Sequence, residues 1–256
     1  MIRKLLREIS DRALYYLSVP KCICCGEILE YGEPVVCDSC RPVYREQKKR
    51  NCSRCTKVIP ECTCSNFYLE SHYIKKLVKV YRYTPANLEL PGNLLIYSLK
   101  HDNRRDTFSF LADELSSSVL SSVDIKGNED RFIVTNVPRR PSAIRRDGYD
   151  HSAVLAKRIA KKLGLKYKQF LKSEAKKAQR ATEGLERRKN AAFAYKRSAK
   201  EDLRGYTIIL VDDVVTTGSS MASCAAMLRG MRAKRIVGAA VSIAYKDSFI
   251  KPQIKY

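Results

Sequence analysis

From Ile208 to Ser220 the chain reads IILVDDVVTTGSS. The first four residues form an apolar run without alternation, which predicts a strand buried on both faces of a parallel sheet. Two adjacent carboxylates, Asp212 and Asp213, end this run, and apolar residues at helical spacing resume after Ser219 or Ser220. A strand, a turn and a helix in this order predict one unit of an open α/β sheet, in which ligands bind at the carboxyl ends of the strands.

The turn after the carboxylates is suited to a phosphate group. Backbone N–H groups and hydroxyls at the start of a helix bind anions, and Gly218 lets the backbone approach closely because it has no side chain. The two carboxylates would repel a phosphate unless they faced sugar hydroxyls or a metal ion. A phosphorylated ribose satisfies both demands.

The same stretch resembles the signature of the type I phosphoribosyltransferases, which bind 5-phosphoribosyl-1-pyrophosphate (PRPP). The resemblance implies that Asp212 and Asp213 hold the ribose hydroxyls and stabilise positive charge in the transition state, which makes them the catalytic candidates. It also implies Mg²⁺ bound together with PRPP. The residues that would wrap the 5′-phosphate are Thr216, Thr217, Gly218, Ser219 and Ser220.

Two other interpretations of this stretch remain open. The first is an ordinary turn between a strand and a helix, with Ser219 or Ser220 as the N-cap. The second is the acidic pocket of a response-regulator receiver, although such pairs lie near the N-terminus of a receiver. The chain contains no G-x-x-x-x-G-K-S, which excludes a P-loop, and no G-x-G-x-x-G, which leaves dinucleotide binding without support.

Nine of the ten cysteines lie between positions 22 and 64, several at C-x-x-C spacing. Charged residues interrupt the first 20 positions, which argues against a signal peptide and therefore against disulfides. Sequential pairing predicts two four-cysteine zinc sites, and an interleaved pairing stays open. We expect Cys24 to be a bystander and Cys224 to lie in the core. The expected zinc ligands are Cys22, Cys25, Cys37 and Cys40, and then Cys52, Cys55, Cys62 and Cys64.

The chain as a whole predicts three parts, an amphipathic helix at 1–19, a four-cysteine zinc module at 20–70 and a phosphoribosyltransferase-like domain at 71–256. Helix 1–19 would pack on its own protein, or dock on a membrane or a partner. Alternating strands and helices predict an α/β fold, a mainly parallel sheet with helices on both faces. The expected strands are 77–83, 132–134, 165–171, 191–195, 208–211 and 235–244; the expected helices are 94–99, 108–120, 149–163 and one after 219.

The order of motifs between about residues 20 and 245 is similar to that of the competence protein ComF family. After the cysteines it comprises VPRRP at 137–141, RRDGY at 145–149, Gln179 with LERRKNA at 185–191, and the Asp-Asp motif. The resemblance implies a protein that handles incoming single-stranded DNA in natural transformation. Two positions depart from the family pattern: Asp150-His151 replaces Asn-Gln, and Thr135-Asn136 replaces an earlier proline.

Positive charge is concentrated in one part of the chain. The formal net charge is +22, and residues 131–204 carry 22 Lys/Arg against 7 Asp/Glu. Such a surface attracts polyanions, which predicts nucleic acid as a partner, although a solvated, solubilising surface is the alternative. Arg139 and Arg140 are the candidates for pyrophosphate contact because guanidinium groups pair well with phosphate oxygens. The candidates for DNA contact are Arg145, Arg146, Lys161 and Lys162.

Aromatic residues interleaved with these cations are candidates for stacking on the bases of a single strand. They are Tyr149, Tyr167, Phe170, Phe193 and Tyr195. The polar segment 172–190 has few apolar anchors and is a candidate lid over the predicted site.

These features predict a ComF-like protein that handles single-stranded DNA and carries a PRPP-binding site, with competence or DNA-uptake proteins as further partners. Two alternatives are an active phosphoribosyltransferase that transfers its group to an unidentified nitrogen acceptor, and a zinc-dependent interaction scaffold. No apolar run approaches the roughly 20 residues that span a bilayer. We therefore expect a cytoplasmic protein, with peripheral attachment to the inner face of the membrane left open.

Overall fold

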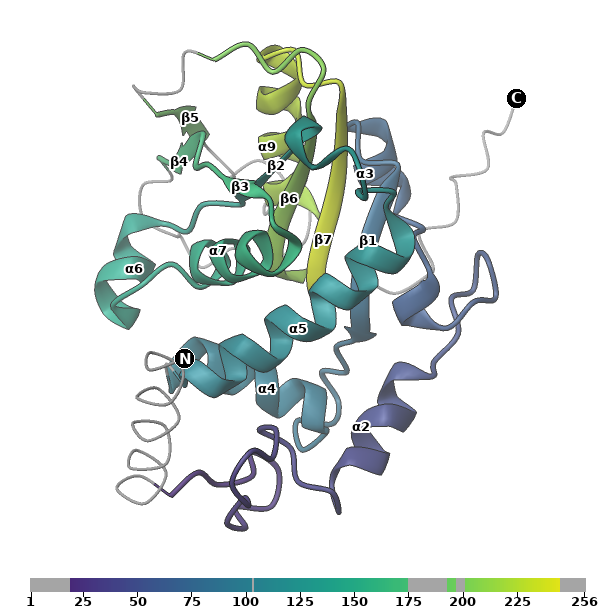
Figure 1. Cartoon of the computed structure of the whole chain (residues 1–256), viewed down its shortest axis with the longest axis vertical. Coiled ribbons are helices and arrows are strands. Elements are labelled where there is room, and N and C mark those ends of the chain that lie inside the picture. The colour runs from purple at the N-terminus through teal and green to yellow at the C-terminus, as the bar shows by residue number, and fades with distance from the viewer. Residues whose placement is uncertain (1–18, 103, 175–192, 197–200, 245–256) are drawn as a thin grey trace.

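The computed structural model describes residues 19–102, 104–174, 193–196 and 201–244, so that the expected helix 1–19 and most of the candidate lid 172–190 lie outside the described residues. A five-stranded sheet forms the centre of the molecule, in the order β1-β7-β6-β2-β3 (Figure 1). All four pairings between neighbouring strands are parallel. The strands are β1 (Lys76–Arg82), β2 (Phe132–Asn136), β3 (Lys166–Tyr167), β6 (Thr207–Val215) and β7 (Arg235–Ile243).

The central strand β6 is buried on both faces, as its uninterrupted apolar sequence predicts. Ile208 and Leu210 point into one hydrophobic core, and Ile209 and Val211 point into the other. Successive side chains of a strand alternate between faces, so one continuous apolar run contributes to two separate cores.

Helices cover both faces of the sheet. On one face α5 and α7 pack against each other and against the strands, and on the other face α9 packs against β6 and the short helix α3. The expected fold class, a mainly parallel sheet with helices on both faces, is therefore confirmed. The bounds of these helices are α3 (Phe67–Ser71), α5 (Arg105–Ser122), α7 (His151–Leu163) and α9 (Ser219–Gly230).

Local sequence explains where several helices begin. Helix α7 starts two residues later than predicted because the side chain of Asp150 accepts a hydrogen bond from the backbone N–H of Ala153 and caps the helix. Helix α4 (Pro91–His101) starts three residues earlier than predicted, with a proline in its first turn, where the missing N–H costs nothing. A further helix that the sequence did not predict, α6 (Pro141–Asp147), also begins with a proline and follows the basic turn.

The predicted single strand 165–171 is wrong. The chain forms β3, then leaves the sheet after Lys168, whose backbone N–H still bonds to the carbonyl of Val134 at 2.9 Å. It resumes as β4 (Leu171–Ser173), which pairs antiparallel with β5 (Phe193–Tyr195) in a separate two-stranded ribbon. The part of the predicted strand 191–195 that is described, Phe193–Tyr195, is β5.

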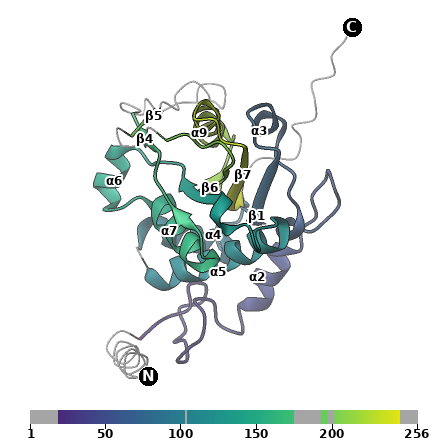
Figure 2. The ribbon, with the colours of Figure 1, turned by 45° about the horizontal axis from the view of Figure 1, so that its top comes forward.

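The cysteine-rich segment contains short elements that the sequence did not predict, α2 (Arg41–Lys48) and the single 3-10 turn η1 (Ile59–Glu61). Helix α2 lies on the side of the molecule opposite to β4 and β5 (Figure 2). Backbone contacts cross the predicted boundary at residue 70, since the N–H of Leu77 donates to the carbonyl of Thr63 at 2.9 Å. The division into a zinc module and a following domain stays a prediction. Within the described residues, no helix is both long and apolar enough to cross a membrane.

Candidate functional site

The predicted site residues lie where two neighbouring parallel strands end. Asn136 of β2 pairs with Val211 of β6, and the backbone N–H of Val137 donates to the carbonyl of Val211 at 2.9 Å. Asp212 and Asp213 come next on β6. The carboxylates and the basic turn 137–141 therefore share the edge of the sheet at which α/β proteins bind their ligands.

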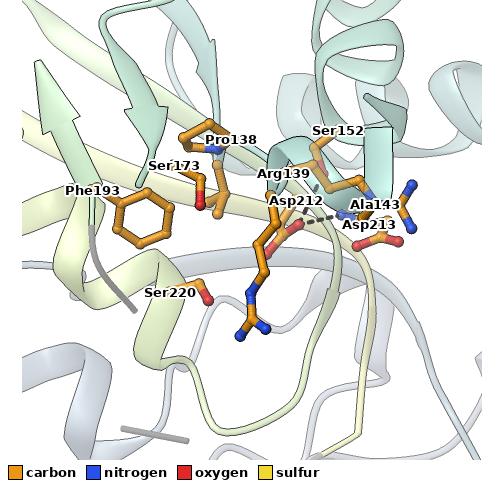
Figure 3. A pocket seen from close by; sticks show the side chains of 11 residues that line it. Pro138, Arg139, Ala143, Ser152, Ser173, Phe193, Asp212, Asp213 and Ser220 are labelled. Carbon is orange, nitrogen blue, oxygen red and sulfur yellow. Dashed lines mark hydrogen bonds between the residues drawn. The ribbon is translucent and has the colours of Figure 1, made fainter. Parts of the chain in front are cut away.

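A pocket of about 330 Å³ opens at this edge (Figure 3). Figure 3 shows Asp212 and Asp213 towards one side of the pocket, Ser173 and Phe193 towards the other, and Ser220 across from the carboxylates. The basic turn, Ala143 of α6 and Ser152 of α7 complete the lining. The pocket is therefore acidic at one end and aromatic at the other.

A smaller hollow of about 40 Å³ adjoins the pocket, and Asp212 and Ser220 line both. All five residues predicted to wrap a phosphate line the hollow, within the segment 214–221. Gly218 has a φ of 84°, and a β-carbon at this position would lie 2.8 Å from Cγ of Leu69. The Oγ1 of Thr217 accepts a hydrogen bond from the N–H of Ser219 at 3.3 Å, which closes the turn at the N-terminus of α9.

The two carboxylates differ in their environments. Burial and the charge of Asp213 hold the pKa of Asp212 well above its usual range, while its Oδ1 accepts hydrogen bonds from Ser152 Oγ at 3.0 Å and the N–H of Asp213 at 2.9 Å. Burial would also raise the pKa of Asp213, but the ammonium of Lys100, 3.4 Å away, and the N–H of Val214 lower it. The pKa values of the two neighbours are therefore shifted in opposite directions, that of Asp212 upward and that of Asp213 downward.

The basic turn brings two arginines to the pocket. Arg139 forms an ion pair with Asp147 at 2.6 Å, and its guanidinium lies 3.3 Å from Nε2 of His151. Arg140 lines the pocket without an ion pair to any residue that the structure describes. Of the two predicted pyrophosphate contacts, Arg140 is therefore the one whose guanidinium forms no ion pair within the part of the chain that the structure describes.

The positions that depart from the ComF pattern support this turn. Asp150 accepts hydrogen bonds from the backbone N–H of Arg139 at 3.1 Å and from Nδ2 of Asn136 at 3.3 Å. Tyr167 in turn donates to Oδ1 of Asn136 at 2.8 Å. His151 is fully buried beside the same turn, and burial, together with the charge of Arg139, lowers its pKa to about 4. The hydrogen bonds of Asp150, Asn136 and Tyr167 therefore hold the backbone of the basic turn in place.

The cysteines gather into two groups, each with four Sγ atoms within 4.8 Å of one another, and the grouping is the sequential one. In the first group Cys25 and Cys37 have their Sγ atoms 3.7 Å apart. A tetrahedral zinc with Zn–S bonds of about 2.3 Å places its sulfurs about 3.8 Å apart, so the donor set fits zinc. Burial raises the pKa of Cys24 to about 12, and this cysteine lies outside the group, as expected of a bystander. The members of the first group are Cys22, Cys25, Cys37 and Cys40; those of the second are Cys52, Cys55, Cys62 and Cys64.

Backbone N–H groups in both groups point at sulfur atoms, a feature of metal-binding cysteine turns. The N–H of Cys24 and that of Cys37 lie 3.4 Å from Sγ of Cys22. Burial would raise the pKa of the Cys22 thiol, but these N–H groups lower it to about 6. Thr56 in the second group has a φ of 60° at the position where the first group has Gly26 with a φ of 76°.

The four predicted DNA contacts are all exposed but do not form one cluster. Arg145 and Arg146 lie on α6, beside the pocket, whereas Lys161 and Lys162 lie in the last turn of α7. About 16 Å of helix separates the start of α7 from these lysines. A single strand that touched all four would have to follow the length of α7.

Most aromatic residues proposed for stacking are engaged elsewhere. Phe170 is completely buried, and Tyr149 donates a hydrogen bond to the carbonyl of Leu99 while its ring packs against the core. Tyr167 bonds to Asn136, and its ring is partly buried. Phe193, which lines the pocket, and Tyr195, which is 45% exposed, present accessible rings.

Sequence reasoning missed four residues that shape the site, because each reaches it through a contact distant in sequence. Lys100 comes from the end of α4, and Ser152 from the start of α7. Ser173 is on β4, and Asn66, the N-cap of α3, donates through Nδ2 to the carbonyl of Thr217 at 3.3 Å. No local pattern signals such contacts.

Comparison with known proteins defines the class. Residues 150–256 match the family model described as phosphoribosyl transferase domain. The purine phosphoribosyltransferase of Pyrococcus horikoshii superimposes with a TM-score of 0.37 at 13% identity, covering 56% of this chain and 85% of that one. A hypoxanthine phosphoribosyltransferase of Staphylococcus aureus gives a TM-score of 0.35 at 11% identity, covering 54% and 63%. The sheet and the family model together make this a phosphoribosyltransferase-fold protein.

Relatives along most of the chain narrow this class. DNA utilization protein YhgH of Salmonella typhimurium is 27% identical over 217 residues, which cover 83% of this chain and 92% of the relative. The protein of the same name from Escherichia coli O157:H7 matches to the same extent. The chain is thus similar, along most of its length, to proteins named DNA utilization protein.

Proposed function

We propose that the protein is a DNA-handling member of the ComF family that binds PRPP at the edge of its sheet. The observation that carries the proposal is the pair of carboxylates on β6 beside a phosphate-sized hollow at the N-terminus of α9. A ribose 5-phosphate needs both a hydroxyl-binding and an anion-binding surface, and these two surfaces adjoin. The family match and the name of the relatives support the same proposal.

Each part of the site has a role in this proposal. Asp212 and Asp213 accept hydrogen bonds from the 2′- and 3′-hydroxyls, and their positions are fixed by Ser152 and Lys100. The N–H groups at the start of α9, with the hydroxyls of Thr216, Thr217, Ser219 and Ser220, bind the 5′-phosphate. Arg140 pairs with the pyrophosphate.

Two kinds of metal ion belong to the proposal. Mg²⁺ bound with PRPP would neutralise pyrophosphate charge, and the carboxylates supply the oxygen ligands that it prefers. Zn²⁺ would be held by the two groups of four cysteines, where it stabilises the fold of the loops that carry them. Neither role requires a redox step.

Single-stranded DNA is the proposed macromolecular partner. The exposed cations of α6 and of the end of α7 would neutralise the phosphates of the strand, and Tyr195 offers an exposed ring for a base. Such a protein would meet DNA and the proteins of its uptake on the cytoplasmic side, either in solution or bound at the inner membrane surface.

Calorimetry with PRPP and Mg²⁺ on the zinc-loaded protein tests the proposal. We expect PRPP to bind saturably at one site. Ribose 5-phosphate and pyrophosphate should each compete with PRPP for that site. A parallel titration with single-stranded DNA at low salt should also give saturable binding. Absence of PRPP binding would refute the site assignment, and absence of DNA binding at low salt would refute the DNA role.

Turnover is a second candidate function, favoured by the shape of the pocket. The pocket extends past the carboxylates to Ser173 and the ring of Phe193, which leaves an aromatic wall beyond the proposed ribose site. A planar nitrogen acceptor stacked there would form a bond to C1′ as the bond from C1′ to pyrophosphate breaks. Release of pyrophosphate, measured with and without DNA, separates an enzyme from a binding protein.

A further inference from the structure

The second cysteine group leads directly into the helix that touches the phosphate turn. Its last member, Cys64, is followed by Ser65 and then by Asn66, the N-cap of α3. Asn66 uses both ends of its amide: Oδ1 accepts from the N–H of Leu69 at 2.8 Å, and Nδ2 donates to the carbonyl of Thr217 at 3.3 Å. The same side chain therefore holds α3 and the turn that lines the small hollow.

Leu69 makes the second contact between α3 and the turn. It is completely buried, and its side chain lies so close to Gly218 that a β-carbon there would be 2.8 Å from Cγ and 2.9 Å from Cδ2. One hydrogen bond and one apolar contact thus fix two consecutive residues of the turn, Thr217 and Gly218. The N–H groups that follow them at the start of α9 are oriented by this contact.

Buried polar contacts fasten the second cysteine group to the sheet beneath. Lys79 of β1 is 1% exposed, and its ammonium donates to Sγ of Cys62 at 3.2 Å and to the carbonyl of Cys64 at 2.6 Å. The described residues offer it no carboxylate, so the charge of this lysine is balanced by the sulfur-rich group. Ser65 adds a buried hydrogen bond from Oγ to the carbonyl of Ile74 at 2.7 Å.

The first cysteine group has a different location. It lies at the end of the molecule away from α9 (Figures 1 and 2), where Arg104 of the α5 N-cap donates to the carbonyl of Lys21 at 2.9 Å. The chain therefore contains two four-cysteine groups of similar chemistry, of which one is joined to the phosphate turn and the other is remote from it. This difference supplies an internal control.

We propose that the second cysteine group is a structural part of the sugar-phosphate site, and that Asn66 and Leu69 are the positioning residues through which metal at this group sets the phosphate turn. The proposal rests on the assignment of PRPP to this site. Metal binding orders the segment 52–64, the order of that segment fixes α3, and α3 fixes the turn. Because coupling between sites is reciprocal, sugar-phosphate binding must also tighten the hold on the metal.

The first experiment isolates the hydrogen bond from Asn66. Asn66→Ser keeps a side-chain oxygen that caps α3 but removes the amide that reaches Thr217. Phe67→Ala is the matched control, because this side chain lies on the same helix and is 49% exposed. In the absence of ligand, amide hydrogen exchange at 216–221 should become about threefold to tenfold faster in Asn66→Ser only, the range expected for one lost hydrogen bond.

The second experiment compares the two cysteine groups. Cys55→Ser with Cys64→Ser, and separately Cys25→Ser with Cys40→Ser, should each lower the zinc content by one ion per chain. Only the first pair should weaken PRPP binding, by about 5- to 150-fold, the usual range for coupled sites. In the unmodified protein, PRPP should slow the release of one of the two zinc ions to a chelator, measured with a colorimetric reagent.

The outcomes separate this proposal from the one on which it rests. If the unmodified protein binds PRPP but both cysteine pairs and Asn66→Ser leave its affinity unchanged, the coupling is refuted and the binding site stands. Loss of affinity in both cysteine pairs alike would also refute it, since general destabilisation would then be the cause. If the unmodified protein does not bind PRPP, hydrogen exchange alone tests the positioning role of Asn66. Unchanged exchange in Asn66→Ser would then refute that role, and faster exchange would support it.

Discussion

Asp212 and Asp213 are neighbours on one strand, yet the pKa of the first carboxyl group is raised and that of the second is lowered. Ser152 and Asp213 surround the first, and Lys100 lies beside the second. Both carboxylates line one pocket because β2 ends at Asn136, opposite Val211, whereas β6 continues through Asp212 and Asp213 to Val215. The edge of the sheet therefore makes this pair usable as a single site.

Replacing both carboxylates should abolish PRPP binding while leaving DNA binding nearly intact. Asp212→Asn with Asp213→Asn removes two charged hydrogen-bond acceptors from the ribose site, and we expect an affinity loss of about 100-fold or more by calorimetry. Affinity for single-stranded DNA, measured by fluorescence anisotropy, should change by less than about twofold, since these groups are not part of the basic surface. A parallel loss of both activities would refute separate sites.

His151 makes a pH-dependent contribution to stability. Burial lowers its pKa to about 4, whereas the unfolded chain has the ordinary value near 6.5, so the unfolded state takes up a proton first as the pH falls. Stability should therefore decline between pH 6.5 and about 4, with on the order of 2 kcal/mol lost at pH 5 relative to pH 7.

Urea unfolding at pH 7 and pH 5, followed by circular dichroism, checks this contribution. His151→Asn should lose less stability over the interval than the unmodified protein, with zinc content measured at both pH values. His101→Asn alters an exposed imidazole and should behave like the unmodified protein. Equal pH dependence in all three proteins would contradict the assignment.

At the scale of the elements, the turn between β6 and α9 depends on a glycine for two separate reasons. Gly218 adopts a left-handed backbone, and its missing side chain makes room for Leu69. Gly205 has the same φ of 84° but has nothing within 4 Å of the position of a β-carbon. Comparing substitutions at the two glycines therefore distinguishes the cost of a left-handed backbone from the cost of steric contact with Leu69.

Gly218→Ala should destabilise the fold more than Gly205→Ala. Each carries the left-handed penalty of about 1–2 kcal/mol, and only the first forces α3 away from the turn. In thermal unfolding Gly218→Ala should have the lower Tm, and it alone should weaken PRPP binding. If both variants lost stability equally and both bound PRPP normally, the contact with Leu69 would have no role in the site.

The helices and strands differ in how well their bounds could be predicted from the sequence. The periodicity of α5 and α7 reflects burial directly, so these helices were predicted to within three residues of their observed bounds. The apolar run predicted the buried part of β6 at 208–211, but the strand continues through both carboxylates to Val215. Helices α3 and α6 have five and seven residues, too few to show a period. The run 165–171 was misassigned because alternation cannot reveal that a chain leaves one sheet and enters another.

The residues of the candidate site also fall into those that the sequence could predict and those that it could not. The carboxylates and the phosphate turn are contiguous in sequence, and their chemistry could be inferred from it. Lys100, Ser152 and Asn66 reach the site only through tertiary packing, because α4, α7 and α3 each approach the strand ends from a different part of the chain. Their roles follow from three-dimensional positions that no local pattern encodes.

At the scale of the whole molecule, positive charge extends from α6 to the end of α7. A strand that contacts four phosphates through this surface should show a salt dependence with a slope near −0.7 per contact. Replacing Arg145, Arg146, Lys161 and Lys162 by glutamine should therefore reduce the slope of log K against log salt by about 3. Fluorescence anisotropy over a series of salt concentrations gives this slope.

A charge-matched control tests whether DNA binds at the cations of α6 and α7 or responds to net charge alone. Four exposed cations elsewhere, replaced by glutamine, give the same change in net charge and should leave the slope within about 1 of its original value. An equal reduction in both variants would mean that total charge alone governs the affinity. The control positions are Arg45, Lys57, Lys75 and Lys126.

The order of strands in the sheet has a consequence for how the protein is made. β1 lies at the edge, and its neighbour is β7, so the first strand of the sheet pairs with the last. A ribosome delivers β1 and the preceding cysteine segment about 150 residues before it delivers β7. During that interval the apolar side chains of β1 lack the neighbours that β7 later supplies. Zinc captured early by the nascent segment would give them a folded partner before translation ends.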